Sequence, residues 1–320
     1  LAPWNWMYDS DVFGVKNPST GEVGYCCVLG RVYGTLGFVL YPGPEGLRTY
    51  TKTQLVRAQK NLFKTLLETR AVTCLFGSRE ELHKRDLEVI KSLGLRFRGR
   101  DAWPIFRSYR PGYYPWFLTS DEARYLTLAL EQCVEVATRF REDPAMLNPP
   151  KPGYYFVRVP IKQDGKISWV DSWLEPEPIV EAGKETPIDR VRLKRALKGA
   201  KKTNLHLEAD LFSLPDPVMG EEDERPFFPR MALWVDQDSG MAVKFDLFKV
   251  DEENVFSESL LRLVETLEMI PSEVHLARKD LEAELATIAN LMGIRLTRER
   301  RLGTLEGVRR ELLKSIGGRW

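Results

Sequence analysis

Residues 231–250, MALWVDQDSGMAVKFDLFKV, contain two apolar runs of strand length on either side of Asp238, Ser239 and Gly240. Each run is rich in the β-branched and aromatic residues that fit a pleated sheet, and the three residues between them favour a turn. We therefore expect two antiparallel strands, 231–236 and 241–250. They open the part of the chain whose fold is easiest to read.

The residues after this pair alternate between helix and strand patterns. Ser257 is placed to cap a helix, and Gly293 closes a second helix that begins at Leu281. With short strands at 274–277 and 294–296 and a last helix at 304–314, the order is β-β-α-β-α-β-α, which predicts a mixed sheet with helices packed on it. We expect Val235 and Val274 to lie in neighbouring buried strands.

The first half reads as a second sheet with helices. Strands are expected at 12–16, 23–29, 36–41, 72–76 and in a hairpin at 154–173, and helices at 53–69, 86–92 and 119–141. At 320 residues two domains are the default. The fold class is therefore α+β, with domains at 1–200 and 201–320; the proline-rich break at 148–153 is the competing boundary.

The composition is that of an ordinary globular protein, with 43% apolar and 29% charged residues. Lysine and arginine total 47 against 46 acids, so no overall field attracts nucleic acid or anionic lipid. No apolar run approaches the ~20 residues that span a bilayer, so no membrane partner is expected. The four cysteines form no CxxC and the three histidines are far apart, which favours reduced buried thiols, a cytoplasmic protein and no cofactor.

Residues 97–117 are the most distinctive stretch, because large aromatic side chains alternate with arginines and prolines. Aromatic faces and guanidinium groups can stack on bases or line a ligand groove. A long irregular connection also needs such residues to pack onto its own domain, and packing is the favoured interpretation. If the protein has a recognition surface, we expect it here, with the candidate binding residues Trp103, Arg107, Tyr109, Arg110 and Trp116.

Two stretches resemble known sequence families. Residues 107–116, RSYRPGYYPW, together with the strands around Gly30 and Gly37, resemble an N-terminal domain of uncharacterised bacterial proteins. The run from Arg225-Pro226 through Asp236, with Asp238-Ser239-Gly240 and 271–274, resembles the domain of unknown function that commonly follows it. The resemblance implies a two-domain bacterial protein and supplies no catalytic residues.

The C-terminal order of elements is also similar to part of a ribonuclease H-like fold. Such folds place acids at the end of a first strand, after a later strand and on a final helix. Asp236, Asp280 and Glu311 (or Glu306) fall at comparable places and could hold magnesium for phosphodiester hydrolysis. Only two strands are clear before the first helix, however, unless residues 205–214 supply a third. Asp280 is equally placed to cap a helix, and Asp236 to end a strand.

Two local basic stretches could contact nucleic acid. Residues 189–202 hold seven basic residues against one acid, and residues 295–320 hold eight against three. Such stretches neutralise phosphates in nucleic-acid-binding proteins, but on helices they are more often solvated faces or partners of acidic segments. Nucleotide-binding loops, a nucleophile elbow and a cysteine nucleophile have no support in the sequence. The favoured function is therefore a non-catalytic binding or interaction protein, with a metal-dependent nuclease as the alternative.

Overall fold

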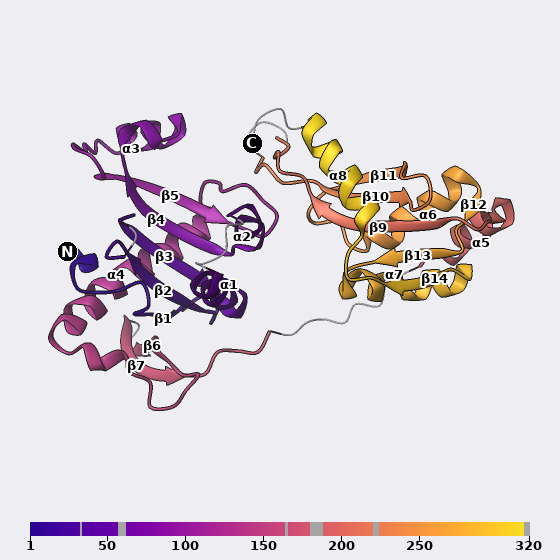
Figure 1. Cartoon of the computed structure of the whole chain (residues 1–320). Coiled ribbons are helices and arrows are strands. Elements are labelled where there is room, and N and C mark those ends of the chain that lie inside the picture. The colour runs from indigo at the N-terminus through magenta and orange to yellow at the C-terminus, as the bar shows by residue number, and fades with distance from the viewer. Residues whose placement is uncertain (33, 57–61, 164–165, 180–187, 220–223, 317–320) are drawn as a thin grey trace. The chain divides into compact units, whose positions relative to one another are not determined.

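The computed structural model describes residues 1–32, 34–56, 62–163, 166–179, 188–219 and 224–316. The chain divides into two compact units, Leu1–Glu181 and Ala182–Trp320. Each unit has its own sheet and its own covering helices (Figure 1). The predicted α+β class is confirmed.

The first unit is built on a seven-stranded sheet in the order β5-β4-β3-β2-β1-β6-β7. All neighbours are antiparallel except β1 and β6, which are parallel. The strands are β1 (Phe13–Lys16), β2 (Val23–Leu29), β3 (Gly37–Pro42), β4 (Ala71–Gly77), β5 (Trp103–Tyr109), β6 (Tyr155–Gln163) and β7 (Lys166–Leu174). The helices are α1 (Gly43–Val56), α2 (Leu62–Glu68), α3 (Lys84–Ser92) and α4 (Ser120–Glu142), with short 3-10 turns at Pro3–Asn5, Arg79–Glu81 and Pro144–Leu147.

The two faces of this sheet carry separate cores. Strand residues alternate between the faces, so Cys26 packs in the core under α4 while Cys27 packs in the core under α1. All four cysteines are free and buried. Burial raises the pKa of the Cys74 thiol to about 11 and that of Cys133 to about 12, which leaves both as protonated, unreactive core side chains.

The second unit is built on a five-stranded sheet in the order β11-β10-β9-β13-β14. Its strands are β9 (His206–Ser213), β10 (Arg230–Asp236), β11 (Ala242–Phe248), β13 (Glu273–Leu276) and β14 (Arg295–Arg298), and a separate parallel pair joins β8 (Lys201–Lys202) to β12 (Met269–Ile270). Helices α5 (Arg190–Gly199), α6 (Val255–Leu267) and α7 (Lys279–Met292) cover one face, and α8 (Gly303–Ile316) covers part of the other.

The strand directions complete the ribonuclease H-like arrangement. Strands β9, β10 and β11 are antiparallel neighbours, and β13 and β14 then run parallel to β9. The strand that the sequence left open is therefore His206–Ser213. The expectation that Val235 and Val274 lie in neighbouring strands is wrong, because β9 lies between them: Leu207 pairs with Asp236 on one side and with Val274 on the other.

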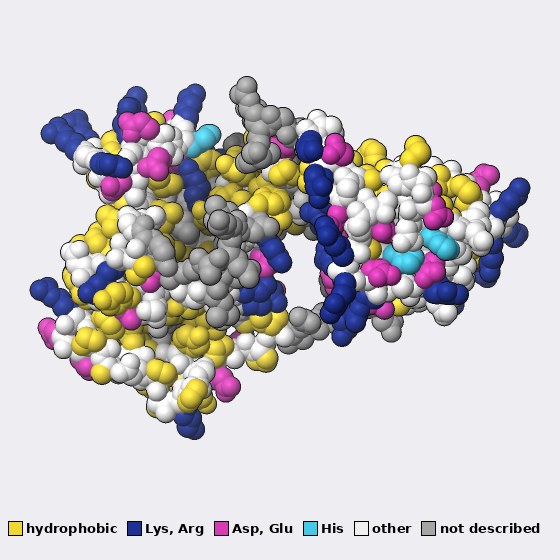
Figure 2. All heavy atoms as spheres, viewed as in Figure 1, with side chains coloured by type: hydrophobic (Ala, Val, Ile, Leu, Met, Phe, Trp, Pro, Cys, Tyr) yellow, Lys and Arg dark blue, Asp and Glu magenta, His cyan; other side chains and the backbone are white. Residues whose placement is uncertain are grey.

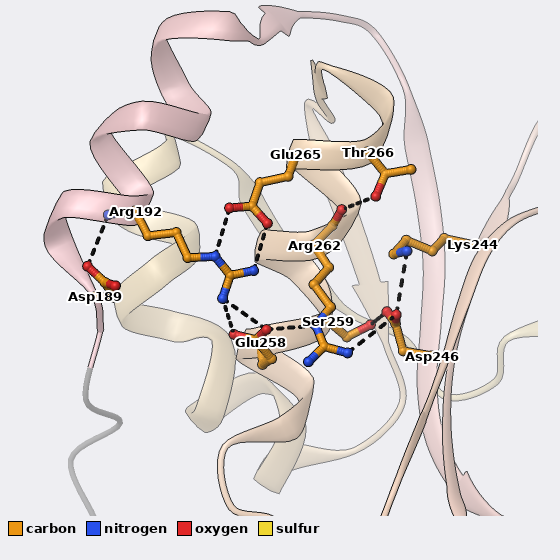
Figure 3. A network of polar contacts seen from close by, with 9 residues as sticks. All are labelled: Asp189, Arg192, Lys244, Asp246, Glu258, Ser259, Arg262, Glu265 and Thr266. Carbon is orange, nitrogen blue, oxygen red and sulfur yellow. Dashed lines mark hydrogen bonds and ion pairs between the residues drawn. The ribbon is translucent and has the colours of Figure 1, made fainter.

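Helix α5 belongs to the second unit, so the predicted boundary near residue 200 lies too far along the chain. Leu193 packs in the core with α6 and α7. Figure 3 shows the Arg192 guanidinium between two carboxylates of α6, with Nε and Nη2 donating to Glu265 at 2.8 and 2.6 Å and Nη1 donating to Glu258 at 2.9–3.0 Å. The alternative break at 148–153 lies within the first unit.

Candidate functional site

The candidate site of the first unit begins with the short helix α3, which a buried ion pair holds against the sheet. The Arg107 guanidinium on β5 donates to both carboxylate oxygens of Asp86 at 2.9 and 2.6 Å. These side chains are only 17% and 11% exposed. Asp86 also accepts the His83 N–H at 2.9 Å, which closes the capping box at the start of α3. Asp86 therefore both starts the helix and fixes it in place.

Phe117 continues this anchor. The guanidinium of Arg107 lies 5.1 Å from the centre of the Phe117 ring, and that of Arg85 lies 4.7 Å from it. The ring centres of Trp116 and Phe117 lie 5.1 Å apart, with the two rings in an edge-to-face arrangement. The backbone of Trp116 also exchanges two hydrogen bonds with Ser108 on β5, at 2.8 and 3.0 Å, so the chain after β5 is held beside that strand.

Helix α4 begins immediately after this segment, at a second capping box. The Glu122 N–H donates to the Thr119 hydroxyl, while the Glu122 carboxylate accepts the Thr119 N–H at 2.9 Å and the Ser108 hydroxyl at 2.8 Å. Arg110 lies 3.2 Å from the same carboxylate. Burial alone would raise the pKa of Glu122, but these hydrogen bonds and the arginine together lower it.

These elements enclose a cavity of about 690 Å³, here named the α3–α4 groove. Its walls are α3 and α4, and its floor is β5. The lining is apolar apart from Arg85, Asp86, Thr127 and Glu131, and much of it faces solvent: Val89 is 51% exposed, Leu93 65%, Leu95 49%, Phe106 39% and Val134 54%. Both the volume and the character of the lining are those of ligand- and peptide-binding grooves.

The five candidate binding residues predicted within 97–117 do not line this groove, although three of them contact residues that form it. Arg107 holds its wall, Trp103 packs 5.7 Å from the lining residue Phe97, and Trp116 packs on the lining residue Phe117. Tyr109 and Arg110 instead line a separate cavity of about 470 Å³ beside Glu22 and Arg70. Sequence reasoning missed the exposed apolar residues of α3; the signal was Val89 and Leu93, four residues apart on a helix without a buried residue.

The three acids proposed for magnesium each have a local partner. Asp236 accepts hydrogen bonds from the Ser239 hydroxyl and the Asp238 N–H in its own turn, and these lower its pKa. Asp280 pairs with Arg278, and Glu311 lies 3.0 Å from Lys314. Within the described ranges no three His, Cys, Asp or Glu side chains gather as a metal site would require. The structure therefore does not bring Asp236, Asp280 and Glu311 together.

Strand β9 carries two acids that the sequence hypothesis did not include: Glu208, which accepts the Leu305 N–H at 2.7 Å, and Asp210. Asp210 is the one that lies beside arginines. It is only 17% exposed, and Arg278 and Arg309 approach its carboxylate at 4.0 and 3.6 Å. Burial raises the pKa of Asp210, the Asp280 charge adds to the rise, and the two arginines oppose it. Arg278 therefore pairs with both Asp210 and Asp280, while Arg309 pairs with Asp210, so two carboxylates face two guanidinium groups.

The predicted basic stretches form two different surfaces. In 189–202, Arg192 is engaged with α6, while Lys194 and Lys198 are exposed. In 295–314, most of the arginines face acids: Arg295 lies near Glu273, Arg298 near Glu282, Arg301 near Glu306 and Arg309 near Asp210. Figure 2 shows Lys and Arg side chains gathered in a row that runs along α8.

The sequence matches two families, one for each unit. Residues 1–158 match the model of a domain of unknown function, DUF7309, and residues 192–313 match that of another domain of unknown function, DUF6930. Together the two matches fit a protein of two domains. The DUF6930 match begins inside α5, in agreement with the assignment of that helix to the second unit. No curated protein matches the chain.

Two solved structures show a limited likeness. The chain is similar, at 17% identity and a TM-score of 0.27, to a chain in the cryo-EM structure of the simian T-cell lymphotropic virus intasome in complex with PP2A regulatory subunit B56 gamma; the match covers 34% of this chain and 40% of that one. It is similar, at 13% identity and a TM-score of 0.24, to the catalytic core domain of BIV integrase, with 35% of this chain and 68% of that one covered. The chain thus spans less than half the length of the first of these proteins.

Among the described residues no helix is long and apolar enough to cross a membrane.

Proposed function

We propose that this protein is a non-catalytic binding protein of the cytosol, and that its DUF7309 domain holds part of a partner polypeptide in the α3–α4 groove. The observation that carries the proposal is the groove itself: large apolar side chains on two helices and a strand remain between 39% and 65% exposed around one cavity. Burying such side chains contributes about 25 cal/mol per Å² of apolar surface, so an occupant is favoured. The free, buried thiols support a reducing compartment.

The arrangement in the DUF6930 domain supports a non-catalytic role. A two-metal hydrolase needs carboxylates that converge on the cations. Here the carboxylates of Asp210 and Asp280 are matched by Arg278 and Arg309, so the cluster is charge-balanced without a cation. Magnesium-dependent cleavage of single- or double-stranded DNA or RNA by the purified chain, lost in Asp210→Asn, would contradict the proposal and favour the nuclease.

The groove is tested with an uncharged environment-sensitive dye, Nile red, titrated into the full chain. We expect enhanced fluorescence from a saturable site, and at least about tenfold weaker binding in Val134→Asp, because a charge must then be desolvated against the apolar lining. The matched control is Val191→Asp, a 70% exposed valine on α5. Equal dye binding in wild type and Val134→Asp, or no dye binding, would refute the groove as a binding site.

A second candidate, nucleic-acid binding by the DUF6930 domain, is favoured by the basic row along α8 (Figure 2). Arg300, which precedes α8, and Arg310 on α8 are exposed and have no ion pair among the described residues. Retention of a mixed DNA or RNA pool should weaken steeply with salt and in Arg300→Glu/Arg310→Glu. An affinity that does not change with salt concentration, or that is the same in the double variant and the wild type, would refute nucleic-acid binding by this surface.

A further inference from the structure

One side of the α3–α4 groove carries an excess of positive charge. From His83 to Arg100 there are six basic residues and two acidic ones. Both acids already have a partner: Asp86 forms an ion pair with Arg107, and Glu88 forms one with Lys84. Lys91, Arg96 and Arg98 are exposed and have no ion pair among the described residues; these three are named the basic rim. The rim flanks the exposed apolar residues Leu93 and Leu95, so an occupant that reaches the apolar lining also approaches these charges.

The floor of the groove argues against a partner that adds as a further strand. Strand β5 is the edge of the sheet, and an edge strand is where an extended peptide would pair. Pro104 has no N–H to offer, and both backbone groups of Ser108 are already bonded to Trp116. The edge is therefore blocked at both ends of the strand, and an occupant must bind through side chains instead of backbone hydrogen bonds.

A helix meets these conditions. Its residues at i, i+3, i+4 and i+7 form one apolar stripe that can enter a groove with helical walls, and its backbone needs no outside partner. A flat bilayer could touch the most exposed lining residues, Leu93 and Val134, but Phe106, at 39% exposed, is less accessible than either, and the site is a cavity of about 690 Å³. The concave shape favours a cylinder over a plane, and the basic rim favours carboxylates beside the apolar stripe.

We propose that the α3–α4 groove binds an acidic amphipathic α-helix of another protein. The apolar stripe of the helix packs against Val89, Leu93, Phe106 and Val134, and its carboxylates face Lys91, Arg96 and Arg98. This proposal rests on the proposed function and adds to it the class of the partner, a helix, and the sign of the partner's charge, which is negative.

The test uses three labelled peptides of about 15 residues, the length at which isolated helices begin to be stable in water. One carries a leucine and phenylalanine stripe with glutamates elsewhere, one carries the same stripe with lysines, and one is a scramble of the acidic peptide. Fluorescence anisotropy with the full chain should show binding of the acidic amphipathic peptide only, weakening with salt. Vesicles of anionic phospholipid provide a further arm.

Two charge-reversal variants sharpen the test. Arg96→Glu/Arg98→Glu should weaken the acidic helix about tenfold or more while the dye affinity stays unchanged, because the rim acts on charge and not on the apolar lining. The matched control, Lys194→Glu/Lys198→Glu, reverses two exposed lysines of α5 and should leave helix binding as in wild type. Val134→Asp should weaken both helix and dye binding by at least about tenfold.

Each contrary outcome overturns a distinct statement. Equal binding of the acidic and basic helices, or an unchanged affinity in the rim variant, refutes the charge assignment. Dye binding without binding of any peptide refutes the helical partner but leaves the groove as a binding site. Binding to anionic vesicles in preference to the acidic helix identifies a lipid surface and refutes the proposal. Absence of both dye and peptide binding overturns the proposed function as well.

Discussion

The Asp86–Arg107 pair should decide whether the α3–α4 groove exists, and Asp86→Asn is the change that tests it. The carboxylate accepts two hydrogen bonds from Arg107 and one from the His83 N–H. Removing one partner of a buried ion pair costs about 3–5 kcal/mol. Asparagine keeps one acceptor oxygen, so we expect about 2–3 kcal/mol. The loss falls on α3, since this helix has no fully buried residue and its other contacts, such as that of Arg85 with Phe117, are partly exposed.

The measurement is native-state hydrogen exchange of the backbone amides of α3, followed by mass spectrometry. A loss of about 2–3 kcal/mol corresponds to exchange that is about 30- to 150-fold faster in α3, with α4 unchanged. Dye binding should fall in parallel, because one wall of the groove is released. The control is Glu88→Gln, which removes only a solvent-exposed partner of Lys84 and should change exchange by less than about threefold.

An Asp86→Asn protein whose α3 amides exchange within about threefold of the wild-type rate would show that the ion pair does not hold the helix. Equal acceleration in α3 and α4 would show that the pair stabilises the whole unit instead of this wall. Either result removes the reasoning that links Arg107 to the groove.

Three further predictions concern stability. Ser259→Ala should destabilise the second unit by about 2 kcal/mol, measured by exchange of the β10 amides, because Ser259 accepts the buried Trp234 indole N–H at 2.8 Å and nothing replaces it; a change below about 0.5 kcal/mol would contradict this. Glu122→Gln should flatten the acid limb of the stability curve of the first unit: its folded pKa is lowered, so its contribution is present above its ordinary pKa of 4.5 and lost as the pH falls through the lower folded value. An identical pH dependence in urea titrations of both proteins would count against it. Arg192→Met should weaken the attachment of α5 to α6, because the hydrogen bonds from Arg192 to α6 are lost. The backbone amides of α5, but not those of α8, should then exchange faster. Equal exchange rates in the variant and the wild type would show that the packing of Leu193 is enough to hold the helix.

Local sequence patterns determined most of the elements and their class. The turn at Asp238–Gly240, the capping box at Thr119–Glu122 and the stop at Gly293 mark features that depend on neighbouring residues only, and each lies where it was predicted. The start of α1 was missed. The sequence predicts a helix from residue 53, yet α1 begins at Gly43, because a proline is accepted in the first turn of a helix, where its missing N–H is not needed.

Pairing between distant segments could be decided only by the tertiary structure. No local pattern near residue 206 predicts that β9 lies between β10 and β13. This placement separates Val235 from Val274. It also puts Asp210, and not Asp236, beside Arg278 and Arg309. The groove has the same origin. The sequence singled out Arg107, but the exposed wall came from Val89 on a different element, and only the fold of the sheet brings the two together. Short-range chemistry fixes helices, turns and caps, whereas a site is formed by side chains that the chain order keeps far apart.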